Sequence, residues 1–343
     1  MSYRKPSPDR RRQRGAALIV AMLVFALATT LVVAMSSEFT LFVKRGANSF
    51  ISSQANAYLR GGEDLARMVL IQDTEDDANR EAGPRDDLSE MWAQQVPPYA
   101  LDEGGFLTGS LQDLENRINI NELAVGSSSD TEQFTSVQAQ FIRLLQSFDE
   151  PRVSEQDARL ILEAVRDWLD ANQEPGDFGA EDDYYFDMEP SYRAANAPMR
   201  SVSELRMVAY MTPELYLAVA PYLTVWGGGT INIHTAPLQI LRTINAKNDL
   251  NPLTPVEGEA LLALRKDGAD LDVGYESIQA FLESPVLEGL ELAPGLTDRL
   301  VESSDFFLYS GQVEVADRTA TLYSVLRREA GRVDTLARVS GSL

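Results

Sequence analysis

An uncharged apolar run of twenty residues, Ala16–Met35, constrains this chain more than any other feature of its sequence. As a helix it would be about 30 Å long, which matches the hydrocarbon core of a bilayer. Residues 1–15, just before the run, carry six basic side chains and one acidic side chain. Because positive flanks stay in the cytoplasm, we expect a single span, with residues 1–15 inside and everything after residue 36 across the membrane.

A cleaved secretory signal peptide is the alternative interpretation, with Ala34 and Ser36 as the small residues at positions −3 and −1 of the cut. Two features favour a retained anchor. The run is longer than the usual signal core, and apolar residues recur beyond it at three- and four-residue steps. We therefore expect one helix over residues 16–70, weakened or kinked at Gly61–Gly62, because glycine costs about 1 kcal/mol relative to alanine in a helix.

Composition excludes several classes of function. The chain of 343 residues holds 30 Lys+Arg and 52 Asp+Glu, a formal net charge of −22, which opposes binding to nucleic-acid backbones. It contains no cysteine, so disulfides, thiolate metal sites and cysteine nucleophiles are excluded. The single histidine, His234, argues against a Ser/His/Asp triad or a multi-histidine zinc site, and we expect it to be a buried or capping residue.

Arg14-Gly15-Ala16 stands immediately before the apolar run, and here the sequence resembles the type IV pilin-like proteins. In that family a prepilin peptidase cuts after the glycine and methylates the new N-terminus. The resemblance therefore implies cleavage after Gly15 and N-methylation of Ala16. Most pilins carry glutamate at the fifth mature position, where this chain has Val20.

The missing glutamate is typical of one branch of that family, the large minor pseudopilin K family of type II secretion systems. The chain is similar to this branch in size and in four internal segments, residues 113–121, 167–175, 179–182 and 231–237. The resemblance implies a non-enzymatic minor pseudopilin that caps the tip of the pseudopilus and helps to start its assembly for protein export across the outer membrane. The implied partners are the I- and J-type minor pseudopilins, prepilin peptidase and lipid of the inner membrane, without nucleic acid, and the C-terminal bulk would lie in the periplasm.

We expect an α+β, pilin-like fold, in which the long N-terminal transmembrane helix packs on an antiparallel sheet that a large all-α domain interrupts. The expected parts are a leader at 1–15, the N-terminal helix at 16–70 (transmembrane at 16–35), a pilin-like α/β domain at 71–121 and 301–343, and a helical insertion at 122–300. Within these parts we interpret acidic residues 72–90 as a solvated connection, 105–121 as a hairpin, and 304–341 as an antiparallel meander of three or four strands.

The densest group of carboxylates, in residues 167–183, predicts a calcium site. If Asp170 is position 1 of a loop, Glu181 falls at position 12, as in an EF-hand, although Pro175 stands where glycine is expected. Like charges this close together repel each other without a cation. The candidate ligands are Asp170, Asn172, Glu174, Asp177, Glu181 and Asp182. The family resemblance also implies calcium in the helical domain, and a solvated acidic loop is the alternative.

Two other functions stay open at this point. Residues 231–250 resemble the opening of helix-hairpin-helix segments, which would suit a DNA-uptake pilin, but they lack a Gly-x-Gly hairpin and the chain is acidic. A membrane-anchored or secreted hydrolase would need two carboxylates in opposed environments. The pattern Ile-Asn-Ile occurs twice, starting at Ile118 and at Ile231, and each copy predicts a short strand followed by helices.

Overall fold

The structure, a computed structural model, describes residues 10–80, 83–102, 104–124, 126, 134–266, 273–316 and 318–341, with side chains from residue 16 onward. The chain forms two compact units, Met1–Tyr58 and Leu59–Leu343. Helix α1 (Arg10–Asp77) begins in the first unit and ends in the second. Among the described residues, α1 holds the one segment that is long and apolar enough to cross a membrane, and its side chains there are exposed.

Helix α1 extends seven residues beyond the expected end at residue 70, and it continues unbroken through Gly61 and Gly62. The two glycines thus do not interrupt the helix, and the expected weakening stays a prediction. A Cβ on Gly62 would lie 2.2 Å from the Tyr309 hydroxyl oxygen, whereas a Cβ on Gly61 would meet nothing within 4 Å. Glycine at 62 thus permits the close approach of α1 to a buried tyrosine of the sheet.

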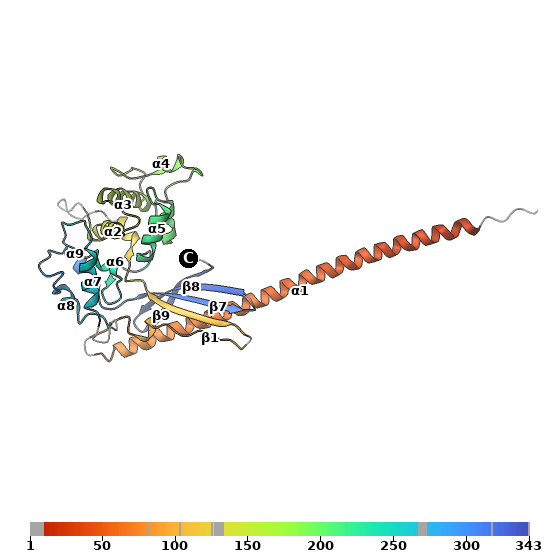
Figure 1. The fold of residues 1–343 in the computed structure, drawn as a ribbon, viewed down its shortest axis with the longest axis horizontal. Helices are drawn as coiled ribbons and strands as arrows, with labels where there is room; N and C mark the ends of the chain where they lie inside the picture. The colour runs from red at the N-terminus through yellow and green to blue at the C-terminus, as the bar shows by residue number, and fades with distance from the viewer. Residues whose placement is uncertain are drawn as a thin grey trace, which may run out of the picture. The chain divides into compact units, whose positions relative to one another are not determined.

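A five-stranded antiparallel sheet, in the order β1-β2-β7-β8-β9, packs on the C-terminal part of α1 (Figure 1). Its strands are β1 (Tyr99–Ala100), β2 (Phe106–Asp113), β7 (Phe306–Val315), β8 (Arg318–Glu329) and β9 (Arg332–Ser340). Glu63 of α1 accepts hydrogen bonds from Ser324 Oγ (2.7 Å) and Arg338 Nε (2.8 Å), which tie the helix to β8 and β9. The expected C-terminal meander is confirmed as three strands.

The expected hairpin over residues 105–121 is wrong. Strand β2 pairs with β1 and with β7, while β3 (Ile118–Asn119) leaves the sheet and pairs in parallel with β4 (Leu223–Thr224). Between β2 and β3 the Asp113 carboxylate accepts a hydrogen bond from the Glu115 backbone N–H (2.7 Å), a local turn that competes with a continued strand. The alternating pattern was real, but it belongs to two different sheets.

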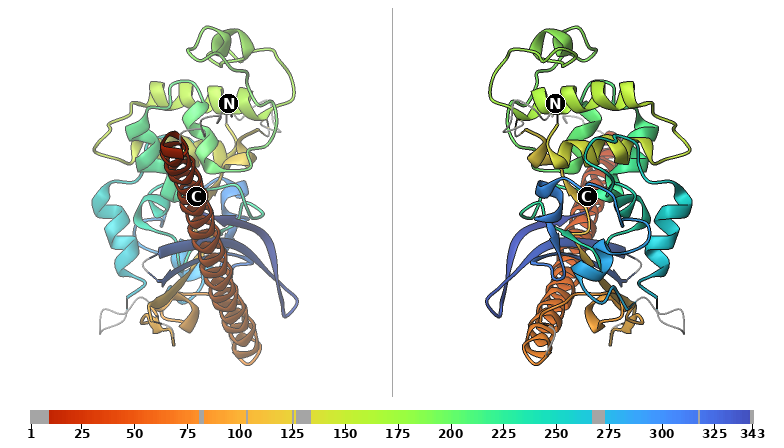
Figure 2. Two further views of the ribbon diagram at one scale, coloured as in Figure 1. Left: turned by 90° about the vertical axis from the view of Figure 1, so that its right-hand side faces the viewer. Right: turned by 90° about the vertical axis from the view of Figure 1, so that its left-hand side faces the viewer.

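Short helices fill the sequence between β3 and β7 (Figure 2). They are α2 (Ser136–Gln146), α3 (Glu155–Leu169), α4 (Asp182–Phe186), α5 (Pro213–Val219), α6 (Leu238–Leu241), α7 (Pro255–Ala263), α8 (Ile278–Leu282) and α9 (Pro294–Thr297). The 3-10 turns are η1 (Met91–Ala93), η2 (Ile120–Ala124), η3 (Val202–Met207) and η4 (Ala220–Tyr222). One apolar core, with Phe141, Tyr185 and Phe281 fully buried, holds these helices together.

The repeated Ile-Asn-Ile pattern has a structural meaning. Strand β5 (Ile231–Asn232) pairs in parallel with β6 (Leu300–Val301), just as β3 pairs with β4. Asn119 Oδ1 accepts from the Asn121 N–H (3.1 Å), and Asn232 Oδ1 accepts from the His234 N–H (2.9 Å). In each copy of the pattern, the asparagine side chain forms the turn at which the chain leaves a short strand, and helices follow.

Candidate functional site

The first candidate site is the acidic loop after α3. Asp170 Oδ1 accepts from the Asn172 backbone N–H (3.0 Å), and Asn172 Oδ1 accepts from the Glu174 N–H (2.6 Å). Asn196 Nδ2 donates to the Asn172 carbonyl (2.6 Å) and ties the loop to a later segment. These bonds give the loop a fixed backbone, while Asn172 and Glu174 themselves remain exposed.

Glu181 is the least compensated side chain of this loop. It is 5% exposed, and neither carboxylate oxygen has a hydrogen-bond partner among the described residues. Burial, followed by the charges of Asp167 and Asp170, raises the pKa of Glu181 to about 7, although the nearby Asn196 lowers it in part. A buried carboxylate without a donor costs free energy, and a bound cation would remove that cost.

Asp167 also belongs to this site, although the sequence pattern did not predict it as a ligand. It is buried at the end of α3, and its two carboxylate oxygens accept from the Gly176 N–H (3.3 and 3.1 Å). Burial raises its pKa. A Cβ on Gly179 would overlap the Asp167 carboxylate, so the loop needs glycine there. The available signal was position, because Asp167 lies in the last turn of α3, three residues before Asp170 at the C-cap.

The remaining predicted ligands are more dispersed. Asp182 Oδ1 accepts from the Ala194 N–H (3.1 Å), and Asp177 is exposed. Within the described parts of the chain, three carboxylates come within 4.8 Å of one another at a different place, formed by Asp73, Asp77 and Asp86. The loop therefore has the donor chemistry of a calcium site around Glu181, but its carboxylates are not drawn together into a closed cage.

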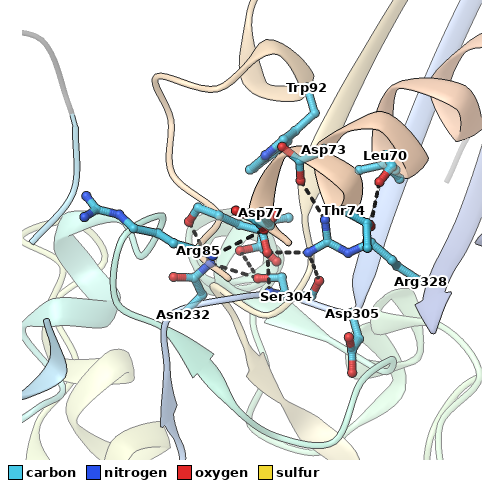
Figure 3. A network of polar contacts seen from close by, with 12 residues as sticks. Leu70, Asp73, Thr74, Asp77, Arg85, Trp92, Asn232, Ser304, Asp305 and Arg328 are labelled. Atoms are coloured by element: carbon cyan, nitrogen blue, oxygen red, sulfur yellow. Dashed lines mark hydrogen bonds and ion pairs between the residues drawn. The ribbon is translucent and has the colours of Figure 1, made fainter. Parts of the chain in front are cut away.

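The second candidate site is a buried polar network around Arg328 of β8 (Figure 3). Arg328 Nη1 donates to Asp73 Oδ2 (2.7 Å), while Nη2 donates to Asp86 Oδ2 and to the Ser304 carbonyl (2.7 Å). The Ser304 N–H also donates to Asp86 Oδ2 (2.6 Å). Ser304 Oγ continues the network to Asp113 Oδ2 (2.7 Å), at the end of β2.

This network corrects the interpretation of residues 72–90 as a solvated connection. Asp77, Asp86 and Asp87 are buried, and Asn232 Nδ2 of β5 donates to the Asp86 carbonyl (3.0 Å). Burial raises the pKa of Asp113 to about 7, and burial together with the neighbouring Glu90 and Asp86 raises the pKa of Asp73. The segment thus joins α1, the sheet and the base of the helical part.

His234 is buried, as expected, and its Nδ1 accepts from the Tyr275 N–H (3.0 Å). Burial, followed by the charges of Arg85 and Arg265, lowers its pKa to about 3, so the imidazole is neutral and offers no charge to a phosphate. At the N-terminus, Ala16 and Val20 are exposed residues of α1. Residues 1–9 of the expected leader lie outside the described residues, and the structure describes no side chain for residues 10–15.

Comparisons with known proteins agree on one family. A family model described as type II secretion system (T2SS), protein K, matches residues 116–228. The chain is 31% identical to type II secretion system protein K of Pseudomonas aeruginosa over 335 residues, which are 97% of this chain and 94% of that protein. It is 29% identical to the protein of the same name from Aeromonas hydrophila, over 97% of this chain and 99% of that relative.

A solved structure has the same fold. The chain is similar to one chain of the crystal structure of the GspK-GspI-GspJ complex from the enterotoxigenic Escherichia coli type 2 secretion system, with a TM-score of 0.70 and 22% identity. The match covers 87% of this chain and all of that one. The expected α+β architecture, with a long N-terminal helix and an antiparallel sheet, is thereby confirmed.

Proposed function

Because the chain belongs to the type II secretion system protein K family, we propose that this minor pseudopilin caps the tip of the pseudopilus and helps to start its assembly for export across the outer membrane. The observation that carries the proposal is the 31% identity over nearly the full length of both chains. The apolar N-terminal helix anchors the protein in a membrane by a single span. The positive charge of residues 1–15 favours the inner membrane, with the bulk of the chain in the periplasm.

Val20 supports a position at the tip. In a shaft, a subunit must accept the N-terminal amine of a neighbour within lipid, where an unpaired charge costs several kcal/mol. A glutamate at the fifth mature position would supply the opposite charge, and Val20 does not. A subunit with no neighbour above it has no amine to accept, so valine costs nothing there.

The I- and J-type minor pseudopilins are the proposed partners. The support is the fold shared with a chain of a complex whose other members are GspI and GspJ. Prepilin peptidase would be a transient partner that cuts after Gly15 and methylates Ala16. Affinity-tagged full-length protein, expressed with its leader, should yield a mature chain that begins at Ala16 and co-purifies with two small pilin-like proteins. A mature chain that begins at Ser37 or Glu38 would contradict the proposal.

We infer a role without catalysis. Paired carboxylates in a hydrolase must reach a substrate, yet Asp113, the fully buried carboxyl with a pKa near 7, accepts hydrogen bonds from Ser304 and Thr235. The DNA-uptake alternative receives no support from relatives that are all secretion-system components. The neutral, buried His234 contributes no positive charge for phosphate contacts.

Calcium is the proposed cofactor of the acidic loop, and the residues fit it. Glu181, whose two oxygens lack donors, and the buried Asp167 would hold the ion, and Asp170, Asn172, Glu174, Asp177 and Asp182 are the further candidate ligands. The ion would neutralise the buried charge and rigidify the loop between α3 and α4. A carboxylate-rich loop of oxygen donors suits calcium, which extracellular modules bind even with modest affinity.

A further inference from the structure

A second group of carboxylates lies far along the sequence from the acidic loop, where α1 ends. Asp73 and Asp77 are one turn apart on α1, and Asp86 follows in the segment after the helix. One carboxylate oxygen of each lies within 4.8 Å of the other two. Asp77 and Asp86 are 6% and 0% exposed, and the side chain of Asp73 is 11% exposed. Water therefore does little to screen the mutual repulsion of these three groups.

The arginines around this trio do not balance its charge. Arg328 pairs with both Asp73 and Asp86. Arg80 pairs with two carboxylates, through Nη2 with Glu90 Oε1 (2.9 Å) and through Nη1 with Asp77 Oδ1 (3.5 Å). The Nε of Arg85 lies 3.2 Å from Asp87 Oδ2. Five carboxylates thus share three guanidinium groups, so the group carries an excess of two negative charges when every carboxylate is ionised. Burial, and to a smaller extent the charge of Asp86, also raise the pKa of Asp113 and of Asp305.

Asp86 supplies an independent sign of a missing partner. Its Oδ2 accepts from Arg328 and from the Ser304 N–H, but its Oδ1 has no hydrogen-bond partner within the described parts of the chain. The side chain is completely buried, so bulk water does not satisfy this oxygen. Buried carboxylate oxygens are rarely left without a donor or a cation, because the uncompensated charge is costly.

We propose that Asp73, Asp77 and Asp86 form a binding site for one divalent cation of the calcium type, separate from the acidic loop. Three carboxylates offset by Arg328 leave two negative charges, which one divalent ion neutralises. Carboxylate oxygens are the ligands that this hard cation prefers, and waters complete its coordination. Arg328 binds the Oδ2 atoms of Asp73 and Asp86, which leaves Asp86 Oδ1 as the oxygen without a donor.

The site would fix the end of α1 to the rest of the second unit. Asp86 is linked through Ser304 to β2 and through Asn232 to β5. A cation that holds Asp86 to Asp73 and Asp77 therefore joins the membrane-anchored helix to both the sheet and the base of the helical part. The alternative to a cation is a single proton shared by Asp73 and Asp86. Calcium binding and the pH dependence of stability distinguish the cation from the proton.

The test uses the mature full-length chain in detergent, with the acidic loop disabled by Glu181→Gln. Terbium, a luminescent probe for calcium sites, is added, and its emission is excited through tryptophan. Trp92, labelled in Figure 3, donates through its Nε1 to Glu90 (2.9 Å), a residue whose charge acts on Asp73. Trp168 belongs to α3, next to Asp167, and reports on the acidic loop instead. We expect sensitised emission that calcium displaces, that Trp92→Phe removes and that Trp168→Phe leaves in place.

Equilibrium dialysis with radioactive calcium gives the count of ions. The Glu181→Gln protein should bind one calcium per chain at this site, and adding Asp77→Asn should abolish that binding, whereas Asp76→Asn, an exposed neighbour on α1, should not. Absence of calcium binding and of Trp92-sensitised emission in the Glu181→Gln protein would overturn the proposal, and this result needs no variant of the trio. Stabilisation by Asp73→Asn above neutral pH, without any effect of calcium, would identify the shared proton. If only the proposed calcium site in the acidic loop is wrong, wild type and Glu181→Gln should bind the same number of calcium ions per chain.

Discussion

Replacing Glu181 by glutamine should have opposite consequences for stability and for calcium binding. Folding moves the pKa of Glu181 from 4.5 to about 7, because burial and the charges of Asp167 and Asp170 disfavour the ionised form. Each pKa unit corresponds to about 1.4 kcal/mol, so ionised Glu181 costs about 3 kcal/mol in the absence of a cation. Because the folded pKa is raised, this cost is absent below pH 4.5 and reaches its full value above pH 7.

In chelator, Glu181→Gln should therefore leave stability unchanged near pH 4.5 and increase the free energy of unfolding by up to about 3 kcal/mol at pH 8. With calcium at about a hundred times the Kd of the acidic loop, binding at the loop should add about 2.7 kcal/mol to the stability of the wild-type chain but not to that of the variant, whereas binding at Asp73, Asp77 and Asp86 would stabilise both alike. The advantage of the variant should then nearly vanish. Asp183→Asn, an exposed charge removal two residues away, is the matched control and should change neither quantity appreciably.

Urea unfolding of the full chain in detergent, followed by tryptophan fluorescence, measures these differences. Trp168 packs edge-on against Tyr185 at 5.3 Å between ring centroids and reports on this region. The reasoning is refuted if Glu181→Gln destabilises the protein in chelator at pH 8. Equal calcium-dependent stabilisation of variant and wild type would remove Glu181 from the ligand set, even if the loop binds calcium through other residues.

The other predictions concern processing, position and packing. Gly15→Ala should leave residues 1–15 attached to the membrane-bound chain, as the intact mass shows, and normal trimming at Ala16 would contradict the cleavage site. Val20→Glu should support secretion as well as wild type, and labelled protein should appear once at filament ends, not at regular intervals along the shaft. Gly62→Ala should destabilise the fold by about 1–3 kcal/mol through overlap with Tyr309. The control variant is Gly61→Ala, whose added Cβ would have no atom within 4 Å, and its free energy of unfolding should rise by up to about 1 kcal/mol. Equal urea midpoints for the two variants would contradict this reasoning.

The parts of the fold that sequence predicted well are those with local causes. The meander of β7 to β9 follows from alternation, and its last turn has Ala330 and Gly331 at φ 49° and 76°. Local signals also stand at helix starts, because α2 begins after the capping box of Thr135 and α7 after that of Thr254. Ser154 caps α3, although Asp157 stands where glutamate completes such a box. Each signal lies within four residues of its effect.

What the sequence did not predict depends on partners far away along the chain. The acidic residues after α1 resemble a solvated linker because their arginine, Arg328, comes from β8. Strand β3 pairs with β4, more than a hundred residues later, so alternation alone assigned it to the wrong sheet. Asp167 was missed because an aspartate in a helix with an apolar face looks like a surface residue until the loop folds back through Gly176 and Gly179.

The register of β2 and β7 has a consequence for how the chain folds and tolerates change. Asp113 pairs directly with Phe307, so everything between these residues leaves and re-enters the sheet at neighbouring points about 5 Å apart. The entropy of closing such a loop grows only with the logarithm of its length, so changes of length that keep Asn232 and Ser304 in place add little closure entropy. The sheet nevertheless cannot close until β7 has been synthesised. The anchor will therefore be in the membrane well before the domain it carries is complete, and a deletion from 114 to 305 bridged by a short turn should nucleate the sheet sooner.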